Sequence, residues 1–251
     1  MSGAEQATYH ANGQIHERYT LVDGKLDGDV VTYDAAGKIS RQAGFKAGKL
    51  DGEVTEFDPA GRVVSRATFR GGVLNGETSI FGSDGWIVQK LNYKDGKIDG
   101  DALAYRNDRI QVRSTYFEGE LEGERITYGD SGQVIARNPY IKGKLSGEAQ
   151  WFDNDGRLVK SARYLDGKLN GDTIEYYESG AVREKSGYKD DQLEGEYLRY
   201  FENGIIQERA FFRQGIPNGD RLQFDESGNV KEAGTKSPTG IRGLLARITG
   251  Q

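Results

Sequence analysis

The sequence predicts an all-β fold, an elongated array of antiparallel β-hairpins that follow one another along the chain. Three observations predict it. A pattern of 24 residues recurs from about residue 21 to about residue 235, each repeat contains two glycine-centred turn signals, and segments rich in Tyr, Phe, Ile, Val and Thr lie between the turns. We therefore expect a repeat array over residues 1–235 and a separate tail over 236–251.

Each repeat has the same order of residue types. The stretch 45–63 reads aromatic-x-x-Gly-x-aliphatic-x-Gly-acid-x-x-x-aromatic-x-x-x-Gly-x-aliphatic. Nine repeats begin at Leu21, Phe45, Phe69, Tyr93, Tyr116, Tyr140, Tyr164, Tyr188 and Phe212. The fourth is one residue shorter, because the turn glycine at 105–110 is missing, and a half repeat at 9–15 precedes the nine. Such a period predicts a protein in which each repeat contacts only its neighbours.

Both turn signals of a repeat are typical of hairpins. Asp23-Gly24 and Asp95-Gly96 represent the short turn, and 34–37 and 177–180 the longer one. Glycine supplies the positive φ that tight turns require. Two strands per repeat give roughly 19 strands in a single-sheet meander, whose strand twist would produce a curved ribbon.

Alternation along the second strand of each repeat predicts two different faces. One face carries an aliphatic residue, a small residue four positions later and the next aromatic residue, as Ile39, Ala43 and Phe45 do, and we interpret it as an internal spine. Strand glycines such as Gly52 are expected either to lie beneath the aromatic rings or to form bulges.

The opposite face carries a column of mostly basic residues. The column consists of Gln42, Arg66, Lys90, Arg113, Arg137, Lys185 and Arg209. It is either a solvated strand face with cross-strand partners such as Glu56 and Glu175, or a docking stripe for an acidic partner or anionic head groups. An acid also follows the strand glycine in every repeat, from Asp29 to Asp220, and we expect it to accept hydrogen bonds from turn amides.

Composition excludes several classes of function. A formal net charge of −5 and a pI of about 5.3 argue against nucleic-acid binding. Cysteine is absent, the only histidines are His10 and His16, and no phosphate-binding loop opens a helix. We therefore predict a non-enzymatic protein with no catalytic residues, no cofactor and no metal. The N-terminal residues lack the features of a secretory signal, which favours the cytoplasm, or the periplasm if a signal has been removed.

Specificity in a repeat array lies at positions that break the pattern. Trp86 occupies a turn position that is polar in other repeats, and Trp151 occupies a row that elsewhere holds Thr32 or Glu56. The apolar candidates for partner binding are Trp86, Trp151, Ile80, Tyr197, Ile205 and Phe211. The basic candidates are Arg66, Lys90, Arg113, Arg137, Lys185 and Arg209.

The tail changes character after Ser237. Pro238 and Thr239 can start a helix. The apolar residues that follow recur at the spacing of one helix face, and the polar side of such a helix would be basic. These apolar residues are Ile241, Leu244, Leu245 and Ile248. We expect a short amphipathic helix that either caps the last strand or touches a membrane or a partner.

The repeat pattern resembles the variant MORN repeat, in particular the arrays of the YwqK-family antitoxins. The resemblance implies a bacterial immunity protein that binds a cognate secreted toxin directly and covers its active site. The toxin could be a lipase, a nuclease or a deaminase. The alternative is a membrane-associated or protein-binding scaffold that uses the basic column and the tail. We expect a monomer in isolation.

Overall fold

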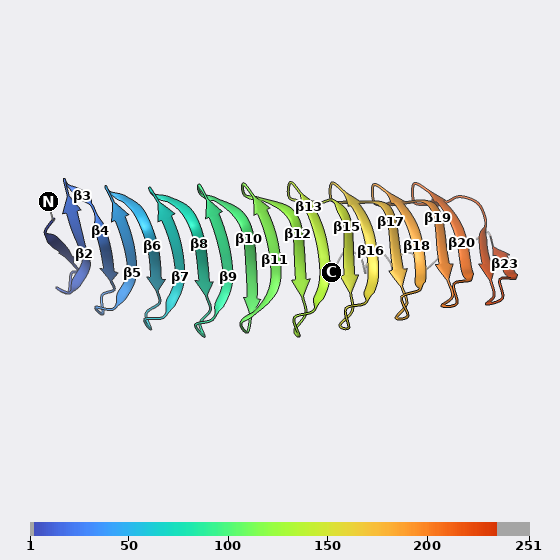
Figure 1. The fold of residues 1–251 in the computed structure, drawn as a ribbon, viewed down its shortest axis with the longest axis horizontal. Helices are drawn as coiled ribbons and strands as arrows, with labels where there is room; N and C mark the ends of the chain where they lie inside the picture. The colour runs from blue at the N-terminus through green and yellow to red at the C-terminus, as the bar shows by residue number, and fades with distance from the viewer. Residues whose placement is uncertain (1–2, 235–251) are drawn as a thin grey trace. The chain divides into compact units, whose positions relative to one another are not determined.

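The computed structural model describes residues 3–234, which are all-β and contain no helix. They form 23 strands of antiparallel sheet, each hairpin leading into the next (Figure 1). This confirms the predicted antiparallel hairpin array. The helix expected within 236–251 lies outside the described residues.

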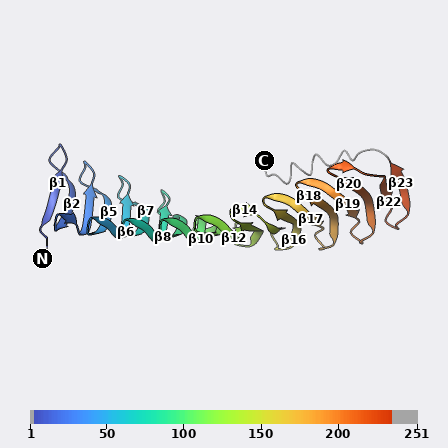
Figure 2. The ribbon, with the colours of Figure 1, turned by 90° about the horizontal axis from the view of Figure 1, so that it is seen from above.

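The chain divides into two compact units. The N-terminal unit comprises Met1–Val134 and Tyr140–Gly143, and the C-terminal unit comprises Ile135–Pro139 and Lys144–Gln251. Strands of the N-terminal unit are β1 (Glu5–Tyr9), β2 (Ile15–Val22), β3 (Lys25–Leu26), β4 (Gly28–Tyr33), β5 (Ile39–Lys46), β6 (Lys49–Phe57), β7 (Val63–Arg70), β8 (Val73–Phe81), β9 (Ile87–Lys94), β10 (Lys97–Arg106), β11 (Arg109–Phe117) and β12 (Glu120–Tyr128). Within this unit the strand direction turns progressively from β1 to β12, as expected of accumulated strand twist (Figure 2).

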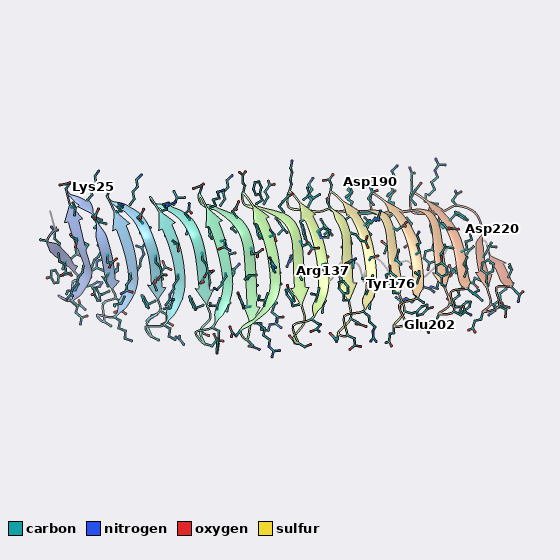
Figure 3. All side chains as sticks on the ribbon, viewed as in Figure 1. Lys25, Arg137, Tyr176, Asp190, Glu202 and Asp220 are labelled. Atoms are coloured by element: carbon teal, nitrogen blue, oxygen red, sulfur yellow. The ribbon has the colours of Figure 1, made fainter. Side chains whose placement is uncertain are left out.

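Strand β13 (Val134–Ile141) contributes residues to both units. The other strands of the C-terminal unit are β14 (Lys144–Leu145), β15 (Gly147–Phe152), β16 (Leu158–Leu165), β17 (Lys168–Tyr176), β18 (Val182–Lys189), β19 (Gln192–Tyr200), β20 (Ile206–Arg213), β21 (Ile216–Pro217), β22 (Arg221–Phe224) and β23 (Val230–Gly234). Short and long turns alternate between two edges of the unit, with Asp190 in a short turn at one edge and Glu202 in a long turn at the other (Figure 3).

The strand glycine forms a β-bulge, one of the two roles that the sequence left open. Gly76 pairs with the aromatic Tyr93 on the next strand, and its φ of 121° lies in a region that other residues rarely adopt. The register between β7 and β8 shifts beside it, which is a bulge. A Cβ atom on Gly76 would lie 3.1 Å from the Cβ of Thr68. The glycine is therefore required by both conformation and space.

The predicted spine is confirmed. In the C-terminal unit the small row runs in register from strand to strand, so that Ala149 pairs with Ala162, Ala162 with Thr173, and Thr173 with Ser186. A buried cluster forms on this spine face from Ala162, Leu169, Tyr188, Leu193, Ala210 and Phe212. In the N-terminal unit the buried apolar spine residues are Val30, Ala43, Val54 and Leu91.

The short turns are tied to one another along their edge. In the N-terminal unit the N–H of Gly48 donates to the carbonyl of Leu26, that of Gly72 to Leu50 and that of Gly96 to Leu74. Because each turn bonds to the preceding repeat, its position is set by backbone hydrogen bonds as well as by side-chain packing.

Candidate protein interface

The basic column is paired with the acids that follow the strand glycines. Four ion pairs join neighbouring strands, Lys90–Glu77 at 3.1 Å, Arg113–Asp101 at 2.8 Å, Lys185–Asp172 at 3.0 Å and Arg209–Glu196 at 2.6 Å. Arg137 also has an interaction partner, and the guanidinium of Arg66 lies 5.8 Å from the ring centroid of Phe81. The column is therefore part of a charge ladder of both signs.

The ladder shifts the pKa of its members in the expected directions. A hydrogen bond from Lys90 is the main cause that lowers the pKa of Glu77, with a smaller opposing effect of burial. A hydrogen bond to Asp172 is the main cause that raises the pKa of Lys185, and Asp101 raises the pKa of Arg113 in the same way. All three shifts favour the charged form of the group concerned, as expected for ion-paired side chains.

Two expectations about these acids are wrong. Glu56 accepts a hydrogen bond from Ser65 instead of pairing with the column, and Glu175 pairs with Lys160 and Arg183. The second expectation was that the acid after the strand glycine accepts hydrogen bonds from turn amides. Instead, this acid forms ion pairs with the basic column. The acid immediately before the strand glycine accepts the hydrogen bonds of the turn amides. The acceptor–donor pairs are Asp27 with Ala47 N, Asp51 with Gly71 N, Asp99 with Glu118 N, Glu122 with Lys142 N, and Glu194 with Gln214 N. These acceptors reach the next repeat because its short turn stacks directly beside them.

Trp86 lies at a long turn and is 55% exposed. At the same position Lys38 donates to the carbonyl of Pro59 in the next turn, and Arg62 donates to the carbonyl of Ser83. An indole has a single short N–H donor and cannot make the same reach. With tryptophan at this position, the repeat lacks the side-chain hydrogen bond to the next long turn and presents an exposed aromatic ring instead.

The other apolar candidates lie on several surfaces. Ile80 belongs to the spine face of β8 and is 37% exposed, whereas Ile205 is half-buried in a long turn. Phe211 lies on the opposite face of β20, where the guanidinium of Arg209 is 5.1 Å from its ring centroid. Within neither unit do these residues form one patch.

Trp151 and Tyr197 both lie against the buried cluster of the C-terminal unit. Each is partly buried, and the ammonium of Lys160 is 5.8 Å from the Trp151 ring. Tyr197 packs edge-to-face on Phe212 with ring centroids 6.3 Å apart. Both rings therefore have an internal packing role, which their place in the repeat did not indicate.

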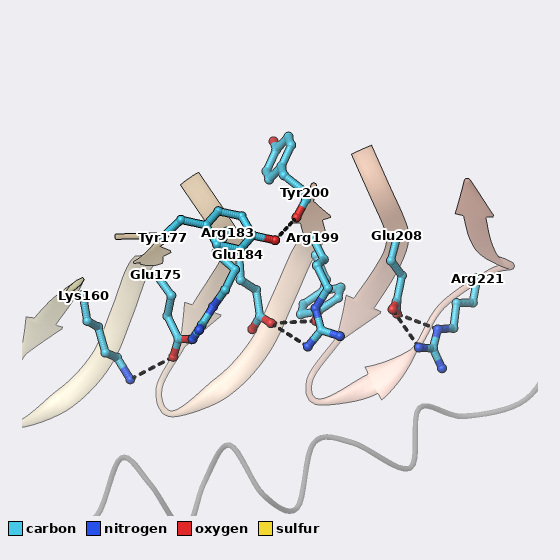
Figure 4. A network of polar contacts seen from close by, with 10 residues as sticks. Lys160, Glu175, Tyr177, Arg183, Glu184, Arg199, Tyr200, Glu208 and Arg221 are labelled. Atoms are coloured by element: carbon cyan, nitrogen blue, oxygen red, sulfur yellow. Dashed lines mark hydrogen bonds and ion pairs between the residues drawn. The ribbon is translucent and has the colours of Figure 1, made fainter. Parts of the chain in front are cut away.

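Beside these rings runs a polar network that the sequence analysis missed (Figure 4). The carboxylate of Glu184 accepts from the Tyr197 hydroxyl at 2.9 Å and pairs with Arg199 at 3.2 Å. Glu208 holds Arg221 through two contacts of 2.5 and 2.7 Å. Both glutamates are buried. They occupy the spine-face row that holds Val112 and Ala136 in other repeats, and this change of residue type was the available signal.

Burial is the main cause that raises the pKa of Tyr197, and the charge of Glu184 adds to it. Burial also raises the pKa of Tyr188. Burial alone would lower the pKa of Arg199, but Tyr197 and Glu184 outweigh it and the pKa is raised. These shifts favour the neutral phenols of Tyr188 and Tyr197 and the charged guanidinium of Arg199.

An exposed apolar patch lies on the short-turn edge of the N-terminal unit. Phe117 and Ile141 are 60% and 53% exposed. They directly follow the first aromatic residue of their repeats, a position that is basic at Lys46, Arg70 and Lys94. This comparison could have revealed both residues from the sequence. We call Phe117 and Ile141 the turn-edge patch.

The turn-edge patch is held in place by its own turns. Gly119 N donates to the carbonyl of Ile98 at 2.8 Å, and Gly143 N donates to the carbonyl of Leu121 at 2.9 Å. A hollow of about 200 Å³ lies beside Phe117, lined by Lys94, Asp95, Lys97, Asp99, Phe117 and Glu118. The patch thus offers a fixed apolar side chain next to a charged hollow, as binding hot spots do.

Among residues 3–234, no His, Asp and Glu side chains gather in groups of three or more that could hold a metal ion. In the same range no helix is long and apolar enough to span a bilayer. His10 and His16 contact each other edge-to-face, with ring centroids 4.6 Å apart, and His10 Nε2 lies 2.9 Å from the carbonyl oxygen of Tyr33.

Comparison with known proteins identifies the repeat. The family model described as the MORN repeat variant matches residues 74–95, 169–190 and 193–214. Each match begins five residues after the first aromatic of a repeat, so all three have the same phase. No curated protein matches the chain.

Solved structures show only distant similarity. The GtfA/B complex bound to UDP and GlcNAc is 18% identical, with 55% of this chain and 25% of that chain covered and a TM-score of 0.21. The Tc holotoxin pore of Photorhabdus luminescens is 14% identical, with coverage of 91% and 14% and a TM-score of 0.18. The chain spans a quarter or less of the length of these proteins, and similarity at such scores carries no inference.

Proposed function

We propose that this chain, a repeat protein that carries variant MORN repeats, is an immunity protein that neutralises a cognate bacterial toxin by binding it and covering its active site. The variant MORN repeats support a protein-binding array. The resemblance to YwqK-family antitoxins supports the narrower role. No substrate needs to be turned over for such a role, since steric coverage requires only a tight interface.

The observation that carries the proposal is the turn-edge patch. Phe117 and Ile141 are exposed in adjacent repeats at a position that is lysine or arginine in five of the nine repeats, and Leu165 at the same position of the next repeat is also exposed. Exposed apolar groups at such a position add nothing to the packing of the array. Aromatic anchors with a polar surround are typical of the centre of a protein interface.

The basic column gives less support to the alternative of a membrane scaffold. Four of its members are ion-paired with neighbouring carboxylates. An anionic membrane would have to compete with these carboxylates for each cation. We therefore favour a protein partner, and we expect the contact to take place in the cytoplasm.

Co-expression with the product of the neighbouring gene tests the proposal. The wild-type chain should form a complex with that protein and protect cells from its toxicity. The double variant Phe117→Lys/Ile141→Lys introduces the residue type that Lys46 and Lys94 provide elsewhere, so the fold should tolerate it. It should lose protection.

A matched control changes the same repeat position on the same edge without touching the patch. Lys46→Gln/Arg70→Gln should fold and protect as the wild type does. No complex and no protection with the wild-type chain would refute the immunity function. Full protection by the folded Phe117/Ile141 variant would refute the role of the turn-edge patch.

A further inference from the structure

A pocket in the C-terminal unit collects positive charge above a buried carboxylate. It has a volume of about 250 Å³. Its walls come from β19, β20, β22, β23 and the turn after β19. The lining residues are Arg199, Phe201, Gln207, Glu208, Arg221, Gln223, Phe224 and Lys231. Three cations therefore face one carboxylate.

The buried carboxylates fix the guanidinium groups in position. The Glu208 side chain is 6% exposed, whereas the Arg221 side chain that it holds is 29% exposed. Glu184 holds one Nη of Arg199, whose side chain is 45% exposed. In both pairs the acid is covered and the guanidinium reaches solvent. Each guanidinium has five N–H donors, so those not directed at the glutamate can bind a second acceptor.

The order of the strands brings these groups to one place. Arg199 pairs in register with Glu208, and Glu208 pairs with Gln223 on β22. Neighbouring strands are about 4.8 Å apart, so Arg199 and Arg221 flank the same carboxylate from two sides. Lys231, on β23, adds a third positive charge to the lining.

The remaining lining residues favour a particular kind of ligand. Phe201 and Phe224 supply flat apolar surfaces, and Gln207 and Gln223 supply amide donors and acceptors. Guanidinium forks match the geometry of carboxylate and phosphate groups. The volume is sufficient for one aromatic ring with its substituent.

We propose that this pocket binds an oxyanion, a carboxylate or phosphate group, carried on a flat apolar body. Arg199 and Arg221 hold the oxyanion, Lys231 adds attraction from the rim, and the phenylalanine rings contact the body. The site is independent of the turn-edge patch, which belongs to the N-terminal unit.

Titration of the full chain with phenyl phosphate, benzoate and inorganic phosphate tests the proposal, with the Nε–H resonances of arginine followed by NMR. We expect phenyl phosphate and benzoate to shift the resonances of Arg199 and Arg221 with dissociation constants on the order of 1 mM or lower. Inorganic phosphate should bind more weakly, because it lacks the flat body.

Two variants with the same change of charge separate the pocket from the general field of the protein. Lys231→Gln should weaken binding about three- to tenfold. Lys189→Gln, which removes an exposed charge from the end of β18 in the same unit, should have no effect. Glu208→Gln removes the only carboxylate of the lining and should strengthen binding if the variant folds.

Three results would overturn the proposal. These are unchanged Arg199 and Arg221 resonances with all three probes, equal weakening by Lys231→Gln and Lys189→Gln, and inorganic phosphate binding as well as phenyl phosphate. The first would show that no site exists, the second that only net charge matters, and the third that the rings do not contribute.

Discussion

The hydroxyl of Tyr197 donates a hydrogen bond of 2.9 Å to a carboxylate oxygen of the buried Glu184, one strand away. Arg199 is the only other group within residues 3–234 for which a contact to that oxygen is seen, at 3.2 Å. A phenol and a guanidinium therefore share the task of solvating a carboxylate that water hardly reaches. This relationship makes Tyr197 important for stability.

Tyr197→Phe should lower the free energy of unfolding by about 1–3 kcal/mol at neutral pH, because a buried carboxylate loses a donor. Equilibrium urea unfolding measures the change. Tyr9→Phe is the control, since Tyr9 is 65% exposed, and it should leave stability unchanged. Equal stability of the Tyr197→Phe variant and the wild type would mean that Arg199 alone satisfies Glu184.

The same residue predicts a response to alkali. The folded state raises the pKa of Tyr197 above its ordinary value of 10.0. Its stabilising contribution is therefore complete below about pH 10 and is lost as the pH rises further, because the unfolded chain releases the proton first. The free energy of unfolding of the wild type should fall more between pH 9 and pH 11 than that of Tyr197→Phe. The difference should be on the order of the free energy that links unfolding to the release of one phenol proton. Parallel curves for the two proteins would contradict the assignment.

Gly76→Ala should destabilise the chain by about 1–3 kcal/mol, the cost of forcing a residue with a Cβ into a sparsely populated conformation. The φ of 121° and the 3.1 Å approach to Thr68 both act against the new methyl group. Thermal unfolding measures the loss. Gln42→Ala, at an exposed strand position, should change stability by less than about 0.5 kcal/mol. A similarly small effect at Gly76 would show that the bulge can relax.

The charge ladder should contribute little to stability. A double-mutant cycle with Lys185→Met and Asp172→Asn should give a coupling below about 1 kcal/mol, because these side chains are 44% and 49% exposed. The coupling should shrink in roughly 1 M salt, which screens exposed charges. By contrast, Arg221→Met should lower the free energy of unfolding more than Lys185→Met or Asp172→Asn does, since Glu208 would be left buried without its ion pair. A large, salt-insensitive coupling in the ladder would contradict this view.

The long turns should be sensitive to acid. Asp58 accepts hydrogen bonds from the N–H groups of Ala60 and Arg62, each at 2.9 Å. The backbone hydrogen bond from Arg62 is the main cause that lowers the pKa of Asp58 below its ordinary value of 3.8. The stabilisation is therefore present above that value and is lost as the pH falls through the lower folded pKa.

Asp58→Ala should consequently lower the melting temperature at neutral pH and reduce the loss of stability on acidification. Asp58→Asn retains an oxygen acceptor and should be milder at neutral pH. Calorimetry across the acid range distinguishes the two. Identical melting temperatures for the alanine and asparagine variants would show that the side-chain acceptor is not used.

The repeat pattern predicted the strand-and-turn layout and the two faces of the sheet. Glycine positions located both turns of each repeat, and alternation separated the spine from the charge ladder, because backbone conformation and strand geometry depend on local residue type. The partner of each charge was not predictable. Which acid reaches Lys185 or the amide of Ala47 depends on how far adjacent repeats are offset, and the bulge at the strand glycine sets that offset.

The candidate site was harder to predict. Trp151 and Tyr197 break the repeat but pack internally, whereas Phe117 and Ile141 break it and are exposed. Unusual residue type alone does not distinguish a ring that fills a gap from one that faces a partner. The distinction requires the positions of the neighbouring side chains, which come from adjacent strands and repeats.

The bonds between short turns give the array a direction. Every short turn from Ala47-Gly48 to Gln214-Gly215 donates an N–H group to a carbonyl of the preceding repeat, and five of these turns also donate to a carboxylate there, as Ala47 does to Asp27. Along the short-turn edge, each repeat therefore offers acceptors to the repeat that follows it and donors to the repeat that precedes it. The two ends of this hydrogen-bonded edge are chemically different, because one ends in donors and the other in acceptors.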